Sequence, residues 1–545
     1  MFQSTVSRRQ FLMSSLGLLA LAGLPQLASA MQGMSKLSPN KASANFKPDV
    51  ELELWCKYNS VAILKGQATQ LMQYSALLLK GPENTITEIA GSYLGPIIRL
   101  YKGQKVRIHL HNALSEPTVT HWHGLHVRAE MDGHPQYAIN SGEVLVYEFE
   151  VVNRASFNIY HPHPHNATAS QVYHGLAGGI IINDDEEKAL ELPAGEYELP
   201  IVIQDRLFDK NNQLIYARNM HQRMTGFYGD RILVNGHADF SCEVASRAYR
   251  LRVLNGSNAR IYKLAWDDGT PITVIGVDGG LLEQPETKPY VMLAPGERLD
   301  VWADFSGRAV GSELTLRSLA FSGVLPRMGM MMGGGSLPVG SDYPIFTAKV
   351  TRQVSDSPKL PTQLSKLPRH SLDDTANPSK PLPISISEAP MAMLLNGRAY
   401  EFNTPQASER VKLNSIQLIE IAHDHQSGGM GGMNHGGGMG MGRMSGMRGG
   451  MGGMGMMNMM MAHPIHLHGQ AFSILSRSIA KEQEADYATV REGFINSGLK
   501  DTVLVMPNET VRIIKPFQDF KGLFMFHCHN LEHEDMGMMR EYLVE

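Results

Sequence analysis

The segment "FHCHNLEHEDMGMM", residues 526–539, decides the fold of this chain. Within it, Cys528, His533 and Met538 offer a thiolate, an imidazole and a thioether, and a more distant His463 adds a second imidazole. One thiolate, two imidazoles and a weak axial thioether form the soft ligand set of a blue copper site. A methionine usually fills a core, but Met538 lies in a polar, glycine-containing turn where packing is a less natural role. The segment therefore indicates a copper site.

Three other windows are also dense in histidine: "HWHG" (121–124), "YHPHPH" (160–165) and "HPIHLHG" (463–469). A single His-x-His pair in a strand places both rings on one face and requires no metal. Four such windows in one chain, one of them with a thiolate, favour several metal ions instead. Half of the 22 histidines lie in these four windows: His121, His123, His161, His163, His165, His463, His466, His468, His527, His529 and His533.

The rest of the chain consists of short runs rich in Val, Ile, Leu and Tyr, separated by Gly, Pro and Asn. Examples are "IIRLYKGQKVRIHLHN" (97–112) and "DTVLVMPNETVRIIKPF" (501–517), and long segments with helical periodicity are scarce. Many short strands at regular spacing are typical of antiparallel sandwiches and barrels. The pattern predicts an all-β fold.

The strands group into three blocks, because a similar order of strand, turn and strand recurs near Gly103, Gly296 and Asn508. A proline-rich polar segment between the second and third blocks has the composition of a linker. We therefore expect repeated sandwich domains rather than one large β domain. The predicted limits are 45–185 for the first block, 190–350 for the second, 351–384 for the linker and 385–545 for the third, with an insert at 427–461.

Residues 1–30 read as an export signal, in which Arg8 and Arg9 precede an apolar stretch that ends in "ASA". The apolar stretch is too short for a comfortable membrane span, so we expect cleavage and no stable membrane anchor. The arginine pair resembles the twin-arginine type of signal, which exports folded proteins, and it predicts a periplasmic location. An ordinary secretory signal or an uncleaved N-terminal anchor is the alternative.

Composition excludes two other classes of protein. The formal charge of −4 is spread over 49 basic and 53 acidic residues without a polybasic stripe, so nucleic acid is not an expected partner. Three cysteines are too few for a disulfide framework in an exported protein of 545 residues. Cys56 and Cys242 either pair with each other or remain two separate buried thiols.

In their order and spacing, the four histidine windows resemble the copper motifs of the multicopper oxidases over essentially the whole mature chain. The pattern is most similar to bacterial periplasmic cuprous oxidases and laccase-like copper-tolerance enzymes. The resemblance implies three consecutive cupredoxin-like Greek-key domains, each a β-sandwich or barrel. It also implies four copper ions per chain: one type 1, one type 2 and two type 3. We expect a monomer.

Carried over motif by motif, the resemblance assigns every copper ligand. The type 1 ion takes His463, Cys528 and His533, with Met538 as the axial ligand, although Met536 and Met539 flank it. The type 2 ion takes two histidines and the type 3 pair takes six, while His165 matches no ligand position. These eight histidines are His121 and His466 for type 2, and His123, His161, His163, His468, His527 and His529 for type 3.

The resemblance also implies the reaction. A donor loses one electron at a time at the type 1 copper, and four electrons pass through Cys528 to the trinuclear cluster, where dioxygen becomes two waters. Reduction of dioxygen also consumes protons, and carboxylates near the cluster are natural carriers. Asp132 and Glu534 stand where the similar enzymes keep such carboxylates. The alternative reading of each is a capped turn or a surface charge.

The donor is the open question, and a methionine-rich segment bears on it. Methionine and glycine fill most of residues 431–461, which lead directly to His463, and a second methionine cluster lies at 327–335. Thioethers suit Cu(I), so Cu(I) is the favoured donor, with Met461 and Met459 as candidate substrate ligands. The well-known periplasmic cuprous oxidases have an aspartate where this chain has Met459, so their substrate site does not transfer whole.

Two alternatives remain. A broad laccase-like phenol oxidase would need an open, mostly apolar pocket beside the type 1 copper. A protein of a different class would use its methionines mainly to sequester copper and would have only incidental oxidase activity. In either case the glycine- and methionine-rich segment has no periodicity that predicts a fold.

Overall fold

A computed structural model describes residues 40–326, 337–389, 391–423 and 460–545. Two sequence predictions lie wholly outside these residues: the export signal at 1–30 and the methionine cluster at 327–335. Met459 and all but the last two residues of the 427–461 insert also lie outside them.

Residues 50–183 form two sheets, in which strands such as β5 (Lys105–Asn112) bury one face while β6 (Thr120–His123) and β8 (Ser156–Pro162) are buried on both. In "KVRIHLHN", for example, Val106, Ile108 and Leu110 are buried while Arg107 and His109 are partly exposed, as the two-residue period of a strand requires. The two buried faces meet in one apolar core around Trp122. In sheet order the strands are β2 (Thr69–Lys80), β1 (Val50–Val61), β5 (Lys105–Asn112) and β7 (Val144–Glu150), then β3 (Ile86–Thr87), β4 (Ile97–Tyr101), β9 (Gly178–Asn183), β8 (Ser156–Pro162) and β6 (Thr120–His123).

Residues 198–352 form a second pair of sheets with its own core, which includes Trp266 and Trp302. Most neighbouring strands are antiparallel, but β10 pairs with β14 in parallel, so the chain crosses between sheets rather than meandering. In sheet order the strands are β12 (His237–Ala238), β11 (Arg231–Val234), β10 (Glu198–Arg206), β14 (Ala248–Asn255), β19 (Arg298–Asp304), β16 (Ile272–Val277) and β17 (Gly280–Lys288), then β13 (Ser241–Ala245), β21 (Tyr343–Arg352), β20 (Glu313–Ser318), β15 (Tyr262–Trp266) and β18 (Val291–Leu293).

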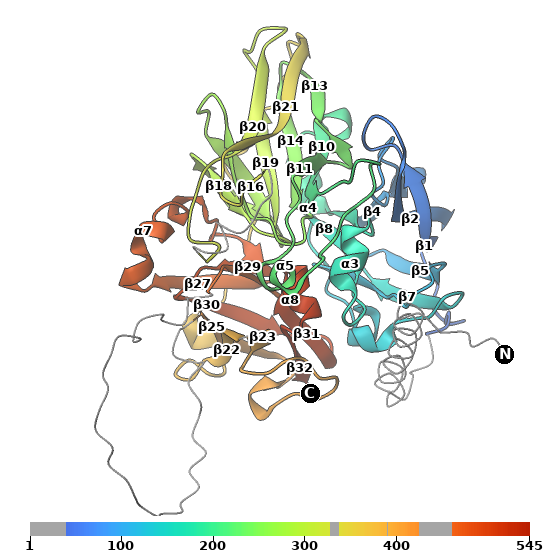
Figure 1. The fold of residues 1–545 in the computed structure, drawn as a ribbon, viewed down its shortest axis with the longest axis vertical. Helices are drawn as coiled ribbons and strands as arrows, with labels where there is room; N and C mark the ends of the chain where they lie inside the picture. Colours follow the sequence, from blue (N-terminus) through green and yellow to red (C-terminus); the bar gives the residue numbers. More distant parts are fainter. Residues whose placement is uncertain (1–39, 327–336, 390, 424–459) are drawn as a thin grey trace, which may run out of the picture. The chain divides into compact units, whose positions relative to one another are not determined.

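Residues 382–544 form a third pair of sheets, and its core includes Cys528 and Met538. Figure 1 shows strands of this pair, including β25, β30 and β31. In sheet order the strands are β23 (Ala392–Leu395), β22 (Leu382–Ala389), β25 (Ser415–His423), β30 (Glu509–Phe517), β27 (Phe472–Ile479) and β28 (Leu499–Lys500), then β24 (Arg410–Val411), β32 (Met539–Val544), β31 (Gly522–Cys528), β26 (His463–Leu467) and β29 (Thr502–Val505).

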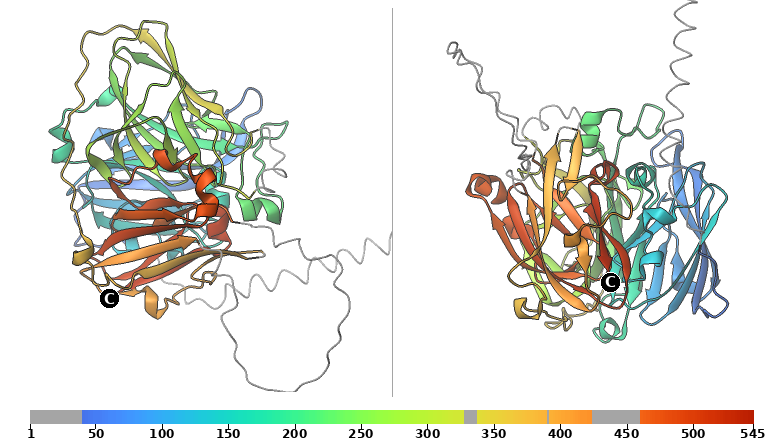
Figure 2. Two further views of the ribbon diagram at one scale, coloured as in Figure 1. Left: turned by 90° about the vertical axis from the view of Figure 1, so that its left-hand side faces the viewer. Right: turned by 90° about the horizontal axis from the view of Figure 1, so that it is seen from below.

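Helices in the described chain are short and lie between strands, as Figure 2 shows from two further directions. None of them is long and apolar enough to cross a bilayer. The α-helices are α3 (Thr168–Tyr173), α4 (Asp185–Lys188), α5 (Met220–Thr225), α7 (Glu484–Tyr487) and α8 (Leu531–Asp535), and the 3-10 turns are η1 (Glu83–Thr85), η2 (Ala129–Met131), η3 (Pro135–Tyr137), η4 (Gly195–Tyr197), η5 (Leu372–Asp374), η6 (Ala407–Glu409), η8 (Lys481–Gln483) and η9 (Arg491–Gly493).

Helix α8 attaches the third sheet pair to the first. The partly buried carboxylate of Asp535 accepts hydrogen bonds from the backbone N–H groups of Thr168 and Ala169, at 2.9 and 3.0 Å, in the first turn of α3. The described residues from Asn40 to Glu545 belong to one compact unit. Cys56 and Cys242 belong to different sheet pairs and are both free thiols.

Candidate copper centres

Strand β31 presents its last residues to two different sites. Successive strand side chains point to opposite faces, so His527 and Cys528 diverge. Strand register pairs His527 with His466 of β26, and it pairs Cys528 with Ile465 inside the apolar core. One strand end therefore supplies a thiol to one site and an imidazole to the other, as the sequence predicted.

The thiol site gathers Cys528 with two buried imidazoles. The Nδ1 atoms of His463 and His533 lie 3.4 and 3.7 Å from the Cys528 sulfur and 3.3 Å from each other. The other ring nitrogen of each histidine donates a hydrogen bond to the protein. His533 Nε2 donates to the Met224 carbonyl at 3.0 Å, and His463 Nε2 donates to the Glu388 carboxylate at 3.0 Å. Such bonds fix the ring orientation, so both Nδ1 atoms stay directed at the sulfur.

Met538 reaches this site because the chain turns back through α8. Its backbone N–H donates to the His533 carbonyl at 2.9 Å, and its carbonyl accepts the Cys528 N–H at 3.0 Å. Met538 is fully buried in the same core as Cys528. The structure thus brings all four predicted type 1 ligands into one region.

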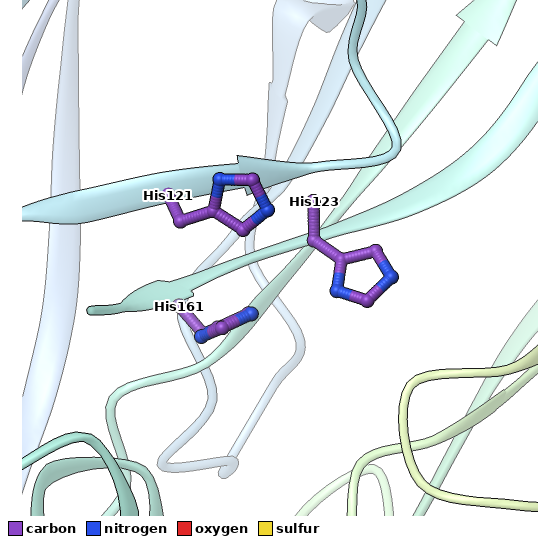
Figure 3. Close-up of side chains that lie close together, drawn as sticks. All are labelled: His121, His123 and His161. Carbon is purple, nitrogen blue, oxygen red and sulfur yellow. The ribbon is translucent and has the colours of Figure 1, made fainter. Parts of the chain in front are cut away.

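The second site begins with the histidines of the first sheet pair. His121 and His161 are register partners on β6 and β8, so their rings share one face of the sheet. His123 and His163 follow two residues later on the same face, while Trp122 points into the core. Figure 3 shows His121, His123 and His161 close together, with ring centres 5.5–5.7 Å apart.

Histidines of the third sheet pair meet those of the first. The Nε2 atoms of His121 and His466, the two predicted type 2 ligands, lie 3.4 Å apart. His121 Nδ1 donates to the Asp132 carbonyl at 2.6 Å, and His466 Nδ1 donates to the Asp501 carbonyl at 2.9 Å. Both Nε2 atoms are therefore free for an ion between them.

The six predicted type 3 ligands fall into two groups. His527 Nε2 lies 3.3 Å from His163 Nε2 and 3.1 Å from His468 Nε2. In the other group, the ring centre of His529 lies 4.9 Å from that of His123 and 5.4 Å from that of His161. The structure brings together every histidine that the motifs assigned to the trinuclear site.

These residues fit metal ions on chemical grounds. Two nitrogens that bind one ion at about 2 Å lie roughly 3 Å apart, close to the separations found here. Several buried ring nitrogens have no hydrogen-bond partner, including His123 Nδ1, His161 Nε2 and both nitrogens of His529. Burial lowers the pKa of His161 to about 4 and that of His163 to about 3, so both rings are neutral at pH 7, as metal ligands must be.

The two predicted carboxylates flank the histidine cluster. Asp132 Oδ2 accepts the His468 Nδ1 hydrogen at 2.7 Å, and burial raises the pKa of this carboxyl well above its usual range. Glu534 Oε2 lies 3.1 Å from His527 Nδ1. Although burial opposes it, the nearby His163 and His527 lower the pKa of Glu534. Neither carboxylate is a surface charge, because both are at most 1% exposed.

Sequence reasoning missed Glu388, which lies at the edge of the thiol site. Its Oε1 accepts both the His463 Nε2 hydrogen and the Met461 backbone N–H, each at 3.0 Å, and its Oε2 accepts His423 Nε2 at 3.1 Å. Burial opposes its ionisation, but the hydrogen bonds from His423 and His463 lower the pKa of Glu388. No motif marks this residue, since it is a lone glutamate on β22, distant in sequence from each partner.

Asp501 and Arg298 were also missed. Asp501 Oδ1 accepts the His123 Nε2 hydrogen at 3.0 Å, which leaves His123 Nδ1 for a metal. Arg298 of β19 donates to both carboxylate oxygens of Asp501, at 2.7 and 2.5 Å. The contact joins residues 203 positions apart, so no local signal could have revealed it.

The remaining predicted residues are placed as follows. His165 is partly buried against Tyr400 and Phe402, away from the clustered nitrogens, in agreement with its lack of a ligand position. Met461 is buried in the core around Cys528. Met459 lies outside the described residues. Which copper each histidine binds stays a prediction.

Comparison with known proteins places the chain among its relatives. Two sequence profiles described as multicopper oxidase match residues 71–187 and 454–545. The multicopper oxidase mco of Staphylococcus aureus is 30% identical over 454 residues, 83% of each chain. A laccase of Bacillus stratosphericus is 29% identical over 517 residues, which span 84% of this chain and 90% of that one. The crystal structure of the McoA multicopper oxidase from Aquifex aeolicus matches with a TM-score of 0.72 at 30% identity, covering 94% of this chain and 100% of that one.

Fold and site together define a copper-dependent oxidoreductase. With 30% identity across most of both sequences, the chain belongs to the multicopper oxidase family. The predicted all-β, three-domain class is confirmed by the six sheets and by the structural match. The predicted domain limits stay predictions.

Proposed function

We propose that this multicopper oxidase takes electrons from Cu(I) beside His463 and uses them to reduce dioxygen at the histidine cluster, in the service of copper tolerance. Bound copper would supply the one-electron redox steps and the four-electron reduction of dioxygen to water. The protein holds the ligands in place, tunes them through hydrogen bonds and controls which donor approaches.

The proposal assigns four ions to each chain. The separations of 3.1–3.7 Å among ligand atoms support one ion at Cys528 and further ions within the histidine cluster. Asp132 and Glu534 would relay protons for dioxygen reduction, one beside His468 and the other beside His527. The assignment gives His463, Cys528, His533 and Met538 to type 1, His121 and His466 to type 2, and His123, His161, His163, His468, His527 and His529 to type 3.

Glu388 is the observation that supports a cationic donor. Oxidation of Cu(I) raises the charge of the donor by one, and a carboxylate against His463 Nε2 stabilises the more positive product. The same carboxylate holds the backbone of Met461, a candidate thioether ligand that leads into His463. A neutral phenol carries no charge for this carboxylate to attract as it binds.

The test compares two donors in one variant. Glu388→Gln keeps the shape of the side chain and removes its charge. We expect Cu(I) oxidation to fall about tenfold, which corresponds to about 1.4 kcal/mol, while oxidation of a phenol is kept or raised. Oxygen consumption with each donor measures the ratio. Glu313→Gln, in an exposed ion pair with Lys349, is the matched control and should change neither rate.

Equal loss of both activities in Glu388→Gln would mean that Glu388 only orients His463, and the Cu(I) proposal would lose its support. Deletion of residues 428–457, outside the described chain, separates the other readings. Loss of Cu(I) oxidation alone favours a role in delivery. Many Cu(I) ions per chain with negligible oxygen consumption would favour sequestration.

We also propose that a twin-arginine signal exports this protein to the periplasm and that the mature protein is a monomer. Replacing Arg8 and Arg9 by lysine should retain the protein in the cytoplasm, which cell fractionation measures. Sedimentation of the mature protein measures its oligomeric state, and a dimer would contradict the monomer.

A further inference from the structure

A buried lysine lies near the histidine cluster without a carboxylate partner. Lys515 of β30 is 1% exposed, and its ammonium donates a hydrogen bond to the Gln470 carbonyl. Among the described residues, no carboxylate oxygen lies within 4.0 Å of its Nζ. A charge buried in a protein interior without a close partner is strongly unfavourable, so a lysine at such a position calls for a function.

The charged groups that face Lys515 belong to the candidate site. Asp132, which accepts the His468 hydrogen, and Asp501, which accepts the His123 hydrogen, are its two electrostatic partners. Burial, which these carboxylates only partly offset, lowers the pKa of Lys515 to about 7. The amine can therefore gain and lose a proton near neutral pH.

A small cavity adjoins the lysine. Its volume is about 10 Å³, close to the space that one water requires. Lys515, His126, His468 and Gln470 all line it. The cavity therefore connects the lysine both to a candidate copper ligand and to a histidine that no copper motif includes.

His126 links this cavity to the surface. Its Nε2 lies 3.0 Å from Oδ2 of Asp519, whose side chain is 59% exposed. Its Nδ1 is buried and has no hydrogen-bond partner in the structure. The ring packs against Phe520, another residue of the cavity wall, with ring centres 4.7 Å apart. His126 Nε2 thus contacts a solvent-exposed carboxylate, while its Nδ1 is buried without a hydrogen-bond partner.

We propose that Asp519, His126 and Lys515 form a proton path from solvent to the histidine cluster. The path rests on the proposed function, because each dioxygen reduced to two waters takes up four protons with its four electrons. Asp519 takes up a proton from solvent and passes it to Nε2 of the His126 tautomer that carries its hydrogen on Nδ1, and this ring releases the Nδ1 proton into the cavity. A water there passes it to the neutral Lys515 amine, and the ammonium releases a proton toward the cluster. The ring then tautomerises back to its starting form, so the path gains and loses one proton and carries no electron.

The test uses the copper-loaded protein and one half of its reaction. The protein is reduced without oxygen and then mixed with oxygen, and the return of the blue absorption gives a rate that no donor limits. Lys515→Met keeps the length of the side chain but carries no proton. We expect reoxidation about 10²-fold slower, with copper content and blue absorption unchanged. Lys521→Met, an exposed lysine in the next loop, is the matched control.

A second variant keeps the test decisive if Lys515→Met does not fold. His126→Gly should slow reoxidation similarly, and added imidazole should restore much of the rate, which a purely structural role would not allow. Lys515→Arg should stay slow, because it keeps the charge but not the titration. Reoxidation at the wild-type rate in His126→Gly from pH 5 to 8 would overturn the path. Wild-type protein that never consumes oxygen would instead overturn the proposed function.

Discussion

Three histidines of the candidate cluster donate a hydrogen bond from one ring nitrogen to the protein, which leaves the other nitrogen for a metal ion. His121, His466 and His468 each donate Nδ1 to an oxygen of Asp132 or Asp501, at 2.6–2.9 Å. The tautomer of each ring is fixed before any metal arrives, and its orientation cannot drift. Preorganisation of this kind lowers the entropic cost of binding the ions.

The same burial makes the copper-free protein sensitive to acid. His161 has a pKa of about 4 when folded, against 6.5 for an ordinary histidine. Between these values the unfolded chain binds more protons than the folded one, so stability falls as pH falls through this window. We expect the urea midpoint of copper-free protein to be lower at pH 5 than at pH 7.

Copper-loaded protein is the control for this experiment, because bound ions stabilise the folded state by mass action. Its midpoint should exceed that of the copper-free protein at both pH values. An unchanged midpoint of the copper-free protein between pH 7 and pH 5 would contradict the prediction.

Sequence motifs revealed the predicted ligands because each motif is local. "FHCHNLEHEDMGMM" places His527, Cys528, His529 and His533 within seven residues, so spacing alone reveals them. Glu388 and Asp501 act on those ligands from other strands, and a single carboxylate carries no pattern of its own. The residues that orient the ligands therefore became visible only in three dimensions.

A turn of the second sheet pair also contacts the histidine cluster. The turn between β18 and β19 contains Gly296, which has a φ of +81°. A Cβ at this position would lie 2.9 Å from two carbons of the His529 ring. Gly296 therefore meets two requirements at once, a left-handed backbone and close contact with a predicted ligand.

We expect Gly296→Ala to disturb the histidine cluster and spare the thiol site. The added methyl group displaces His529, so copper bound at the cluster and oxygen consumption should fall, while the blue absorption of the Cys528 site persists. Copper analysis together with the visible spectrum measures both effects.

Gly307→Ala is a matched control for this change. Gly307 has a φ of +77°, but a Cβ there would meet nothing within 4 Å. Both variants should lose about 1 kcal/mol or more of unfolding free energy from the backbone. Equal copper loss in both would show that the contact with His529 is unimportant.

The sequence pattern predicted where strands lie better than it predicted which strands pair with each other. The run "IIRLYKGQKVRIHLHN", in which the pattern predicts strands, contains β4 and β5. The order of strands within each sheet, with parallel pairs such as β1 with β5, depends on contacts between distant segments. Periodicity within a strand contains no information about that order.

Over the whole molecule, Arg298 binds all three sheet pairs at the edge of the cluster. It lies on β19 of the second pair and forms the buried ion pair with Asp501 near the third. It also donates to the Phe157 carbonyl at 3.0 Å and to the Asn158 side chain at 3.2 Å, both on β8 of the first. The second sheet pair thus stabilises a site to which it contributes no predicted ligand.

We expect Arg298→Met to lower the unfolding free energy by about 3–5 kcal/mol, because it leaves the Asp501 carboxylate buried and unpaired. Copper binding at His123 should weaken as well, since Asp501 orients that ring. Chemical denaturation and copper analysis measure the two effects. Arg308→Met, which breaks a more exposed ion pair with Asp268, should change stability by less than about 1 kcal/mol.

The three-domain class could be predicted from the sequence because strand runs and copper motifs repeat along the whole chain. The interfaces could not, since they depend on single residues such as Arg298 and Asp535, which resemble ordinary surface charges in the sequence. Partners in other sheet pairs satisfy both side chains, so Arg298 is buried and Asp535 is partly buried.

The hydrogen bonds of Glu388 also bear on how this protein can change over evolution. His423 and Met461, on either side of the methionine- and glycine-rich segment, bond to the two oxygens of one carboxylate. The two ends of the segment are therefore held close together. The entropic cost of closing such a loop grows only with the logarithm of its length, by about 0.6 kcal/mol per doubling. Lineages can lengthen or shorten this segment almost without effect on folding. Its length and methionine content can therefore change without loss of the contacts that hold its two ends.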